Sequence, residues 1–195
     1  MNVGRLKRFG YVLDHMKRLY KDILDKDELK LLDRLYSFKS VRDANFRLNN
    51  LPELLRNDFQ GLYVPNKNEI VLREHAPEYL TVMLHEGVHA ATYHELKNHV
   101  RFDKKTQTYK AKTEAGQKLI DVFEKAKRLA AEKQFDTAHN AFKNIDEFVS
   151  EIHTNKQLRS FLKDKSLWNT ILDAIRSILG LQHISKHTQI GRAHV

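Results

Sequence analysis

The stretch Leu84-His85-Glu86-Gly87-Val88-His89-Ala90 reads H-E-x-x-H, and the rest of the chain is interpreted around it. Residues four apart on an α-helix share one face, so His85 and His89 can approach a common atom. Glu86 lies about 100° around the helix from His85 and about 60° from His89. Two imidazoles with an adjacent carboxylate suit a catalytic Zn²⁺ site, in which the histidines hold the metal and Glu86 takes a proton from the attacking water.

The residues that flank this motif, over 79–96, are apolar on nearly every side of the expected helix. A helix of this kind is buried, and buried histidines need polar partners, of which a metal ion is one. The alternative is a pair of core histidines with ordinary hydrogen bonds. Gly87 costs helix propensity, which predicts close packing against a neighbouring element.

The chain has 34 Lys and Arg against 25 Asp and Glu, which gives a net charge of +9, and it has no cysteine. The lack of cysteine excludes disulfides and thiolate zinc sites, and it fits a reducing compartment such as the cytoplasm. A basic balance can indicate a nucleic-acid partner. Basic residues are interspersed with acids, however, and no RNP box or zinc finger occurs, so nucleic acid is not the favoured partner. We expect no membrane segment and no secretion signal.

The segment before the motif contains two expected structures. Residues 3–36 are predicted to be helical, with an apolar stripe that includes Leu19 and Ile23. Residues 61–72 are predicted to form a β-hairpin around a Pro-Asn-Lys-Asn turn. We expect its second strand, Glu69, Ile70, Val71 and Leu72, to offer an exposed edge that holds an extended peptide substrate by main-chain hydrogen bonds. The alternative is a scaffold hairpin without substrate contact.

A third protein ligand is expected from Asn144-Ile145-Asp146-Glu147-Phe148-Val149-Ser150-Glu151. Glu147 and Glu151 lie four apart on a helix with an apolar opposite side, and burying carboxylates there is costly unless they meet a cation. Two His and one Glu would leave a zinc position open for water, and the other carboxylate could hold the far nitrogen of a ligand histidine. An ordinary amphipathic helix is the alternative. Further helices are predicted over 106–133 and 168–179.

The motif His85-Glu86-Gly87-Val88-His89-Ala90, followed by Asp146-Glu147-Phe148-Val149-Ser150-Glu151, resembles the zincin metallopeptidases that use glutamate as third ligand, the gluzincins. It looks most like the compact zincin-like domains of phage and prophage large polyvalent proteins, and like the catalytic domain of anthrax lethal factor. The hairpin and the closing helix, Ser166-Leu167-Trp168-Asn169 onwards, also look similar, so the resemblance covers residues 61–181.

Residue by residue, the resemblance implies His85, His89 and Glu147 as zinc ligands and Glu86 as the base. It implies Glu151 as a carboxylate that supports a zinc ligand without binding the metal itself. Such domains often have a Tyr seven residues before the ligand Glu, which stabilises the oxyanion. In this chain that position is Asn140, with His139 beside it. Either side chain can donate a hydrogen bond to a developing oxyanion, so both are candidate catalytic residues.

We therefore expect an α+β, predominantly helical fold that is zincin-like, with a small β-hairpin or sheet packed on the H-E-x-x-H helix. Residues 1–60 would form a helical N-terminal part of the domain, 61–181 its metallopeptidase core, and 182–195 a polar tail. The expected function is a zinc-dependent endopeptidase acting on a protein or peptide, phage- or prophage-encoded, and cytoplasmic or virion-associated. The alternatives are a weak or inactive zinc-stabilised binding module of a phage polyprotein, and a basic nucleic-acid-binding protein.

Overall fold

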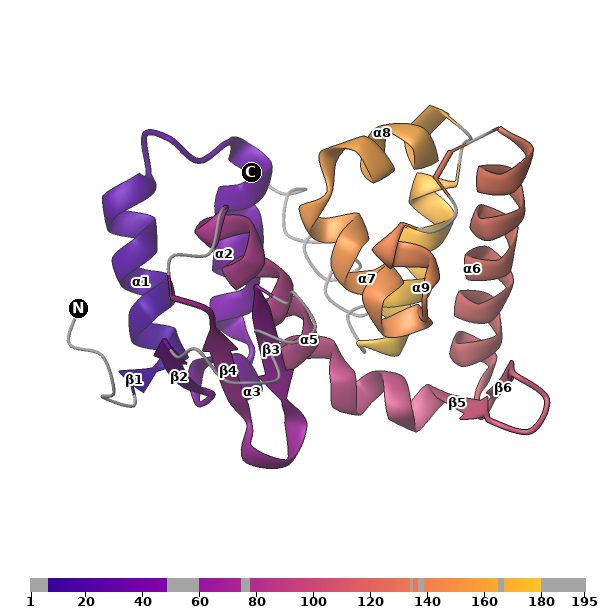
Figure 1. Cartoon of the computed structure of the whole chain (residues 1–195), viewed down its shortest axis with the longest axis horizontal. Coiled ribbons are helices and arrows are strands. Elements are labelled where there is room, and N and C mark those ends of the chain that lie inside the picture. Colours follow the sequence, from indigo (N-terminus) through magenta and orange to yellow (C-terminus); the bar gives the residue numbers. More distant parts are fainter. Residues whose placement is uncertain are drawn as a thin grey trace, which may run out of the picture. The chain divides into compact units, whose positions relative to one another are not determined.

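The computed structural model is mostly helical with small β-sheets, which confirms the predicted α+β, predominantly helical class (Figure 1). The residues that it describes are 7–48, 60–74, 78–133, 135–136, 139–164 and 167–179. Among the helices of these segments, none combines the length and apolar character needed to cross a bilayer. The predicted polar tail over 182–195 lies outside the described residues.

Contacts between residues divide the chain into two units, and each is described by itself below. The units are Met1–Tyr93 with Val149–Asn155, and His94–Phe148 with Lys156–Val195. The division runs through two continuous helices, α5 (Tyr79–His99) and α7 (Ile145–Thr154). The domain boundaries expected from the sequence, after residues 60 and 181, stay a prediction.

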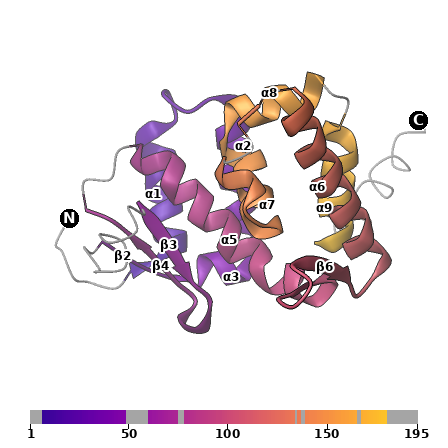
Figure 2. The same ribbon diagram turned by 45° about the vertical axis from the view of Figure 1, so that its right-hand side comes forward.

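A four-stranded mixed sheet lies in the first unit, with the strand order β1-β2-β4-β3, and Figure 2 labels β2, β4 and β3 of this sheet. Its strands are β1 (Lys7–Arg8), β2 (Asn45–Leu48), β3 (Gly61–Val64) and β4 (Glu69–Leu72). β3 and β4 form the predicted hairpin, in which Asn68 takes the left-handed conformation (φ 43°) that asparagine tolerates. β4 also pairs in parallel with β2, and every residue of β4 is buried. β4 is therefore an interior strand of this sheet.

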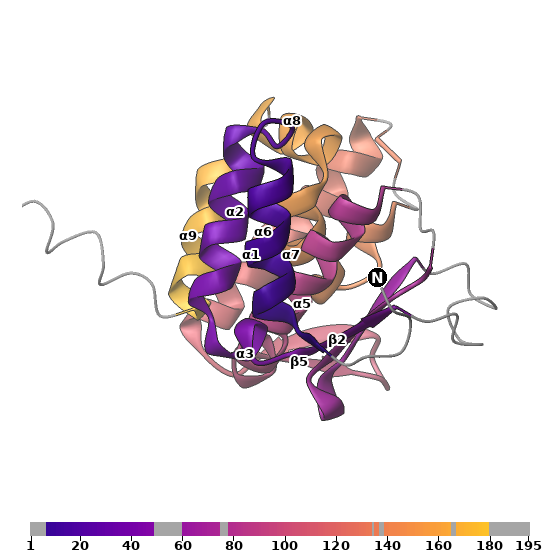
Figure 3. The same ribbon diagram turned by 90° about the vertical axis from the view of Figure 1, so that its left-hand side faces the viewer.

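The first two helices of this unit pack side by side (Figure 3). They are α1 (Phe9–Tyr20) and α2 (Lys26–Ser37), and the short α3 (Lys39–Arg42) follows. α2 begins with a capping box, because Asp25 accepts from the backbone N–H of Glu28 while Glu28 accepts from the N–H of Asp25. The two helices bury Phe9, Leu13 and Leu32 in the core.

The predicted N-terminal helix is wrong at its start and in part of its stripe. Lys7 and Arg8 form β1, paired antiparallel with β2, so the helix begins only at Phe9. Leu19 and Ile23 are exposed rather than buried. Periodicity alone missed this boundary because the partner strand lies far along the sequence.

The second unit is built on α6 (Glu114–Glu132), which packs beside α9 (Trp168–Ile178) (Figure 2). Its other helices are η2 (Asn140–Phe142) and α8 (Lys156–Asp164). Phe123 of α6 meets Phe148 edge-on, with ring centroids 5.3 Å apart, and Phe148 also meets Phe142. α9 confirms the predicted last helix over its described residues.

The predicted helix over 106–133 is wrong in its first turns. Residues Val100–Asp103 and Thr108–Ala111 form an antiparallel hairpin, β5 and β6, and α6 begins only at Glu114. Thr113 caps α6 by accepting a hydrogen bond from the N–H of Gly116 (3.1 Å). The β-branched Thr106 and Thr108 and the aromatic Tyr109 favour strand over helix here.

Close packing around Gly87 confirms the expectation for this helical glycine. A Cβ at Gly87 would lie 3.0 Å from Leu35 Cδ1 and 3.2 Å from Phe9 Cε1. Both neighbours are almost fully buried and have little room to move. Gly87 thus lets α5 lie closely against the α1–α2 pair.

A buried ion pair joins the parallel strands β2 and β4, and it gives the first testable prediction. Glu69 is 6% exposed, and its Oε1 lies 3.0 Å from Arg47 Nε while Arg47 Nη2 donates to Oε2 (3.3 Å). We expect Glu69→Gln to lower the free energy of unfolding by about 2 kcal/mol, less than for a fully enclosed pair because Arg47 is partly exposed. Urea unfolding of Glu69→Gln, Arg47→Gln and the double variant measures the coupling. If the double variant loses as much unfolding free energy as the two single variants together, Glu69 and Arg47 do not stabilise each other.

Candidate metal centre

The two motif histidines converge on one point of α5. His85 Nε2 and His89 Nε2 are 3.0 Å apart, and their rings are 72° from coplanar. The helix is buried around them, since Leu84, Val88 and Ala90 are all inside. The helical spacing predicted from sequence is therefore realised with both Nε2 atoms on the same side.

A carboxylate of α7 completes a group of three. Ligand atoms of His85, His89 and Glu147 all lie within 4.8 Å of one another. Glu147 stands on the first turn of α7, one turn before Glu151, and the continuous helix fixes the two relative to each other. The carboxylate at 147 is thus close to both imidazoles.

The spacing of these atoms fits a small divalent cation. With Zn–N bonds of 2.0–2.1 Å in a tetrahedron, two nitrogen ligands lie about 3.3 Å apart. The observed 3.0 Å between the Nε2 atoms is close to that separation. A nitrogen–nitrogen–oxygen donor set without thiolate suits zinc and other first-row divalent ions.

The outer nitrogen of His85 is held by the next turns of α7. Glu151 Oε1 lies 3.8 Å from His85 Nδ1, and Thr154 Oγ1 lies 3.5 Å from the same nitrogen. Asn155 Nδ2 donates to Glu151 Oε2 (3.2 Å), which orients that carboxylate. Oxygens at Nδ1 favour the tautomer that leaves Nε2 free to bind a cation. The supporting role of Glu151 stays a prediction.

Asn140 contacts the carboxylate of Glu147. Its Nδ2 donates to Glu147 Oε2 at 2.6 Å, and Asn144 Oδ1 accepts from the backbone N–H of Glu147 at 2.8 Å. His139 Nδ1 accepts from the N–H of Ala141 (3.1 Å) at the start of η2. One amide hydrogen of Asn140 is therefore committed to Glu147, and the oxyanion role of His139 and Asn140 stays a prediction.

The start of α7 is held by a tyrosine. The N–H of Ile145 donates to Tyr109 Oη on β6 at 3.1 Å. Burial raises the pKa of Tyr109 above its usual value, so the phenol stays neutral at physiological pH. This contact fixes the first turn of α7, on which Glu147 stands.

Glu86 is buried, with 7% of the residue exposed, and it lies under the first residue of β3. A Cβ at Gly61 would come within 2.9 Å of Glu86 Cγ, 2.8 Å of Leu72 Cδ2 and 2.7 Å of Val82 Cγ1. No real Cβ approaches atoms this closely, so only glycine fits here without a shift of its neighbours. Gly61 lets the strand pass directly over the candidate base.

The predicted substrate edge, Glu69, Ile70, Val71 and Leu72, is wrong. β4 pairs with β2 on one side and with β3 on the other, so it has no free edge. All four residues are buried, and the carboxylate of Glu69 is paired with Arg47. Within the described residues, β3 pairs only with β4 and is the edge strand nearest Glu86.

Sequence reasoning missed several side chains that support this centre. Asn144 contacts Glu147, Thr154 contacts His85, and Asn155 contacts Glu151. Asn144 carried a local signal, because Asn three residues before an acidic residue at a helix start is a capping position. Thr154 carried none, since its partner His85 lies far along the sequence.

Comparison of the chain with protein-family models, with curated proteins and with solved structures finds no match.

A second prediction tests the close approach of β3 to α5. We expect Gly61→Ala to destabilise the protein by about 1–3 kcal/mol, because the added methyl overpacks Val82, Leu72 and Glu86. Val82→Ala removes the nearest atom, so the double variant should recover part of this loss. Thermal unfolding of the single and double variants measures the coupling, and equal losses with and without Val82 would exclude the clash.

Proposed function

We propose that this protein is a zinc-dependent peptidase. The observation that carries the proposal is the convergence of His85, His89 and Glu147, from two separate helices, to within 4.8 Å. Three protein ligands are typical of catalytic zinc sites, whereas structural sites have four. The H-E-x-x-H order adds a carboxylate, Glu86, directly beside the group.

In this proposal His85 and His89 would bind Zn²⁺ through Nε2, and Glu147 would bind through its carboxylate. When bound, zinc supplies a Lewis acid that polarises a peptide carbonyl and makes a neighbouring water more acidic. Glu151 and Thr154 orient the imidazole of His85 from its Nδ1 side, and Asn140 orients the carboxylate of Glu147. These supporting contacts lower the cost of assembling the three ligands.

Glu86 is proposed as the general base and acid. It takes a proton from the attacking water and then gives that proton to the amine nitrogen that leaves. Its burial beneath Gly61 limits access of bulk water to the carboxylate. The shared proton would therefore pass between substrate groups rather than to solvent.

The substrate is proposed to be an extended stretch of protein. β3 passes over Glu86 and, among the described residues, has one side without a paired strand. A peptide added there would form main-chain hydrogen bonds that do not depend on its side chains. This proposal replaces the edge that the sequence suggested on β4.

A second candidate function is a zinc-stabilised binding module without turnover. The observation that favours it is Asn140, which stands where related domains often have an oxyanion tyrosine and which donates to Glu147. The phage or prophage context, with a cytoplasmic or virion location, is proposed only from the resemblance. Metal content and peptide cleavage together separate the two candidates.

A third prediction tests the proposed base. We expect purified protein to bind about one zinc per chain, and Glu86→Gln to keep that zinc while proteolysis falls at least about 100-fold. Glu95→Gln, an exposed glutamate on the same helix, is the matched control and should leave both values unchanged. The measurements are metal analysis and cleavage of a peptide library. Unchanged cleavage by Glu86→Gln would show that Glu86 is not the base. If both proteins bind zinc and neither cleaves a peptide, the binding module without turnover is favoured.

A fourth prediction tests Asn140 as a residue that positions the ligand. We expect Asn140→Ala to weaken zinc binding about 10–100-fold, because Glu147 then loses the hydrogen bond that orients it. Competition with a chromophoric chelator measures the affinity, and thermal unfolding of the metal-free form checks the fold. Asn98→Ala on the exposed side of α5 is the control. Equal zinc affinity in both variants would contradict a positioning role.

A further inference from the structure

The β5–β6 hairpin concentrates positive charge in a short part of the chain. We name residues 100–112 the basic hairpin; it contains five Lys or Arg and one Asp, a net charge of +4 out of +9 for the whole protein. Figure 1 shows it joining the end of α5 to the start of α6. All five basic side chains are exposed.

The two faces of the basic hairpin differ in character. Phe102 lies opposite Tyr109 on one face, where Tyr109 packs edge-on against Phe123 of α6. Arg101 lies opposite Lys110 on the other face. Directly opposed like charges destabilise a β-ladder, and among the described residues only the carboxylate of Asp103, on the same face, offsets the charge of Lys110.

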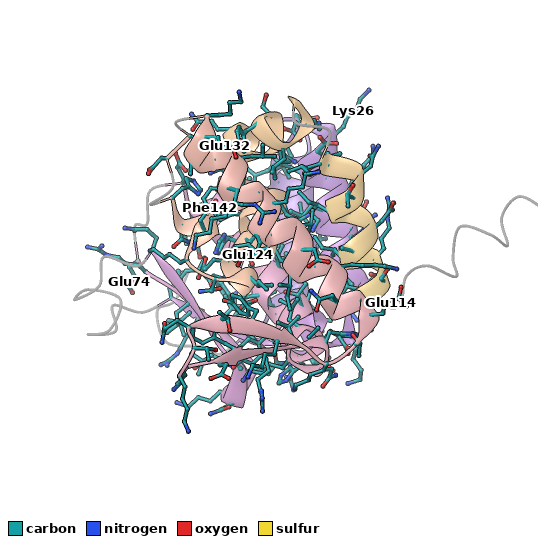
Figure 4. All side chains as sticks on the ribbon, turned by 90° about the vertical axis from the view of Figure 1, so that its right-hand side faces the viewer. Lys26, Glu74, Glu114, Glu124, Glu132 and Phe142 are labelled. Carbon is teal, nitrogen blue, oxygen red and sulfur yellow. The ribbon has the colours of Figure 1, made fainter. Side chains whose placement is uncertain are left out.

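Acidic side chains neutralise only part of this charge. Asp103 pairs with Lys110 at 2.6 Å, and that contact helps to lower the pKa of Asp103, which therefore stays ionised. Glu114, at the start of α6, pairs with Lys118 instead (2.7 Å), and Figure 4 shows it with other acids along that helix. Within the described part of the chain, no carboxylate pairs with Arg101, Lys104 or Lys105.

Hydrogen bonds hold the basic hairpin in shape at both ends. At the base, the N–H of Lys112 donates to His99 O (2.8 Å), and Lys112 Nζ donates to Lys97 O (2.6 Å). In the turn, Gln107 takes a left-handed conformation (φ 55°) and its Nε2 donates to Lys104 O (2.7 Å). The backbone of the basic hairpin is therefore already ordered, so binding of a partner costs little backbone conformational entropy there.

We propose that the basic hairpin binds the phosphate backbone of nucleic acid. A two-stranded ribbon is narrow enough for the major groove of a duplex, which is about 12 Å wide, and protein β-ribbons are used in this way. Phosphates repeat along the strand, so contacts from Arg101, Lys104 and Lys105 do not require one particular register of the nucleic acid. An acidic protein would need a matching pattern of carboxylates. The contact is mainly to the backbone and carries little sequence preference.

The proposal is independent of the candidate metal centre, and the experiment keeps the two apart. Fluorescence anisotropy would measure binding of the full chain to DNA and RNA duplexes of about 20 base pairs, and to the single strands, over a range of salt. The key variant combines Arg101→Glu, Lys104→Glu and Lys105→Glu. Its control combines Lys30→Glu, Lys125→Glu and Arg128→Glu, which change the net charge equally at exposed sites outside the basic hairpin.

We expect salt-dependent binding by the wild-type chain that persists when a chelator removes metal. The basic-hairpin variant should bind at least about 10-fold more weakly, and its plot of log affinity against log salt should be shallower by about 2–3. The control should lose less than about threefold. An Arg101→Gln, Lys104→Gln, Lys105→Gln variant, expected to show an intermediate loss, replaces the key variant if thermal unfolding shows that the latter is misfolded.

Three results would overturn the proposal. The first is the absence of any salt-dependent binding by the wild-type chain. The second is an equal loss in the variant and its control, which would mean that net charge alone attracts the nucleic acid. The third is binding to vesicles rich in phosphatidylserine with none to nucleic acid, which would assign the basic hairpin to a membrane surface.

Discussion

The structure is constrained most by the 3.0 Å separation of His85 Nε2 and His89 Nε2 inside a buried helix. Two imidazolium rings cannot lie this close without strong repulsion, and two bare nitrogens facing each other would repel as well. A single proton between them satisfies the pair, and so does a shared metal ion. The nearby carboxylate of Glu147, which is half-buried, adds a negative charge beside the two imidazoles and so favours a cation over a neutral pair.

That constraint sets demands on the surrounding fold. The middle turns of α5 must be buried while two other elements come very close to them, and glycines at positions 61 and 87 make this approach possible. α7 must present its first and second turns to the histidines, which requires both ends of that helix to be anchored. Tyr109 holds its first residue, and Thr154 near its end contacts Ser150 and His85. His85, His89 and Glu147 are thus positioned by the packing of α5 and α7 as much as by their own hydrogen bonds.

The parts of the fold that could be predicted from sequence are those set by local spacing. His85 and His89 share a face because of the helical repeat, and Glu147 with Glu151 does so for the same reason. The position of β4 could not be predicted, because its parallel partner β2 lies far along the chain and leaves no pattern in β4 itself. Four consecutive residues, Glu69 to Leu72, read as one strand of a hairpin whether that strand is central or at an edge. The β5–β6 hairpin was missed because its lysines also fit a polar helix.

The amide at position 140 limits how fast the proposed chemistry could be. An amide that donates to Glu147 steadies a metal ligand in the ground state and in the transition state alike, so it improves metal binding without selectively lowering the barrier. A phenol aimed at the oxyanion acts only as charge develops there, and loss of one such donor costs about 2.7–4 kcal/mol. If Glu86 acts as the proposed base and His85, His89 and Glu147 hold zinc as proposed, that loss predicts a slow peptidase rather than an inert one.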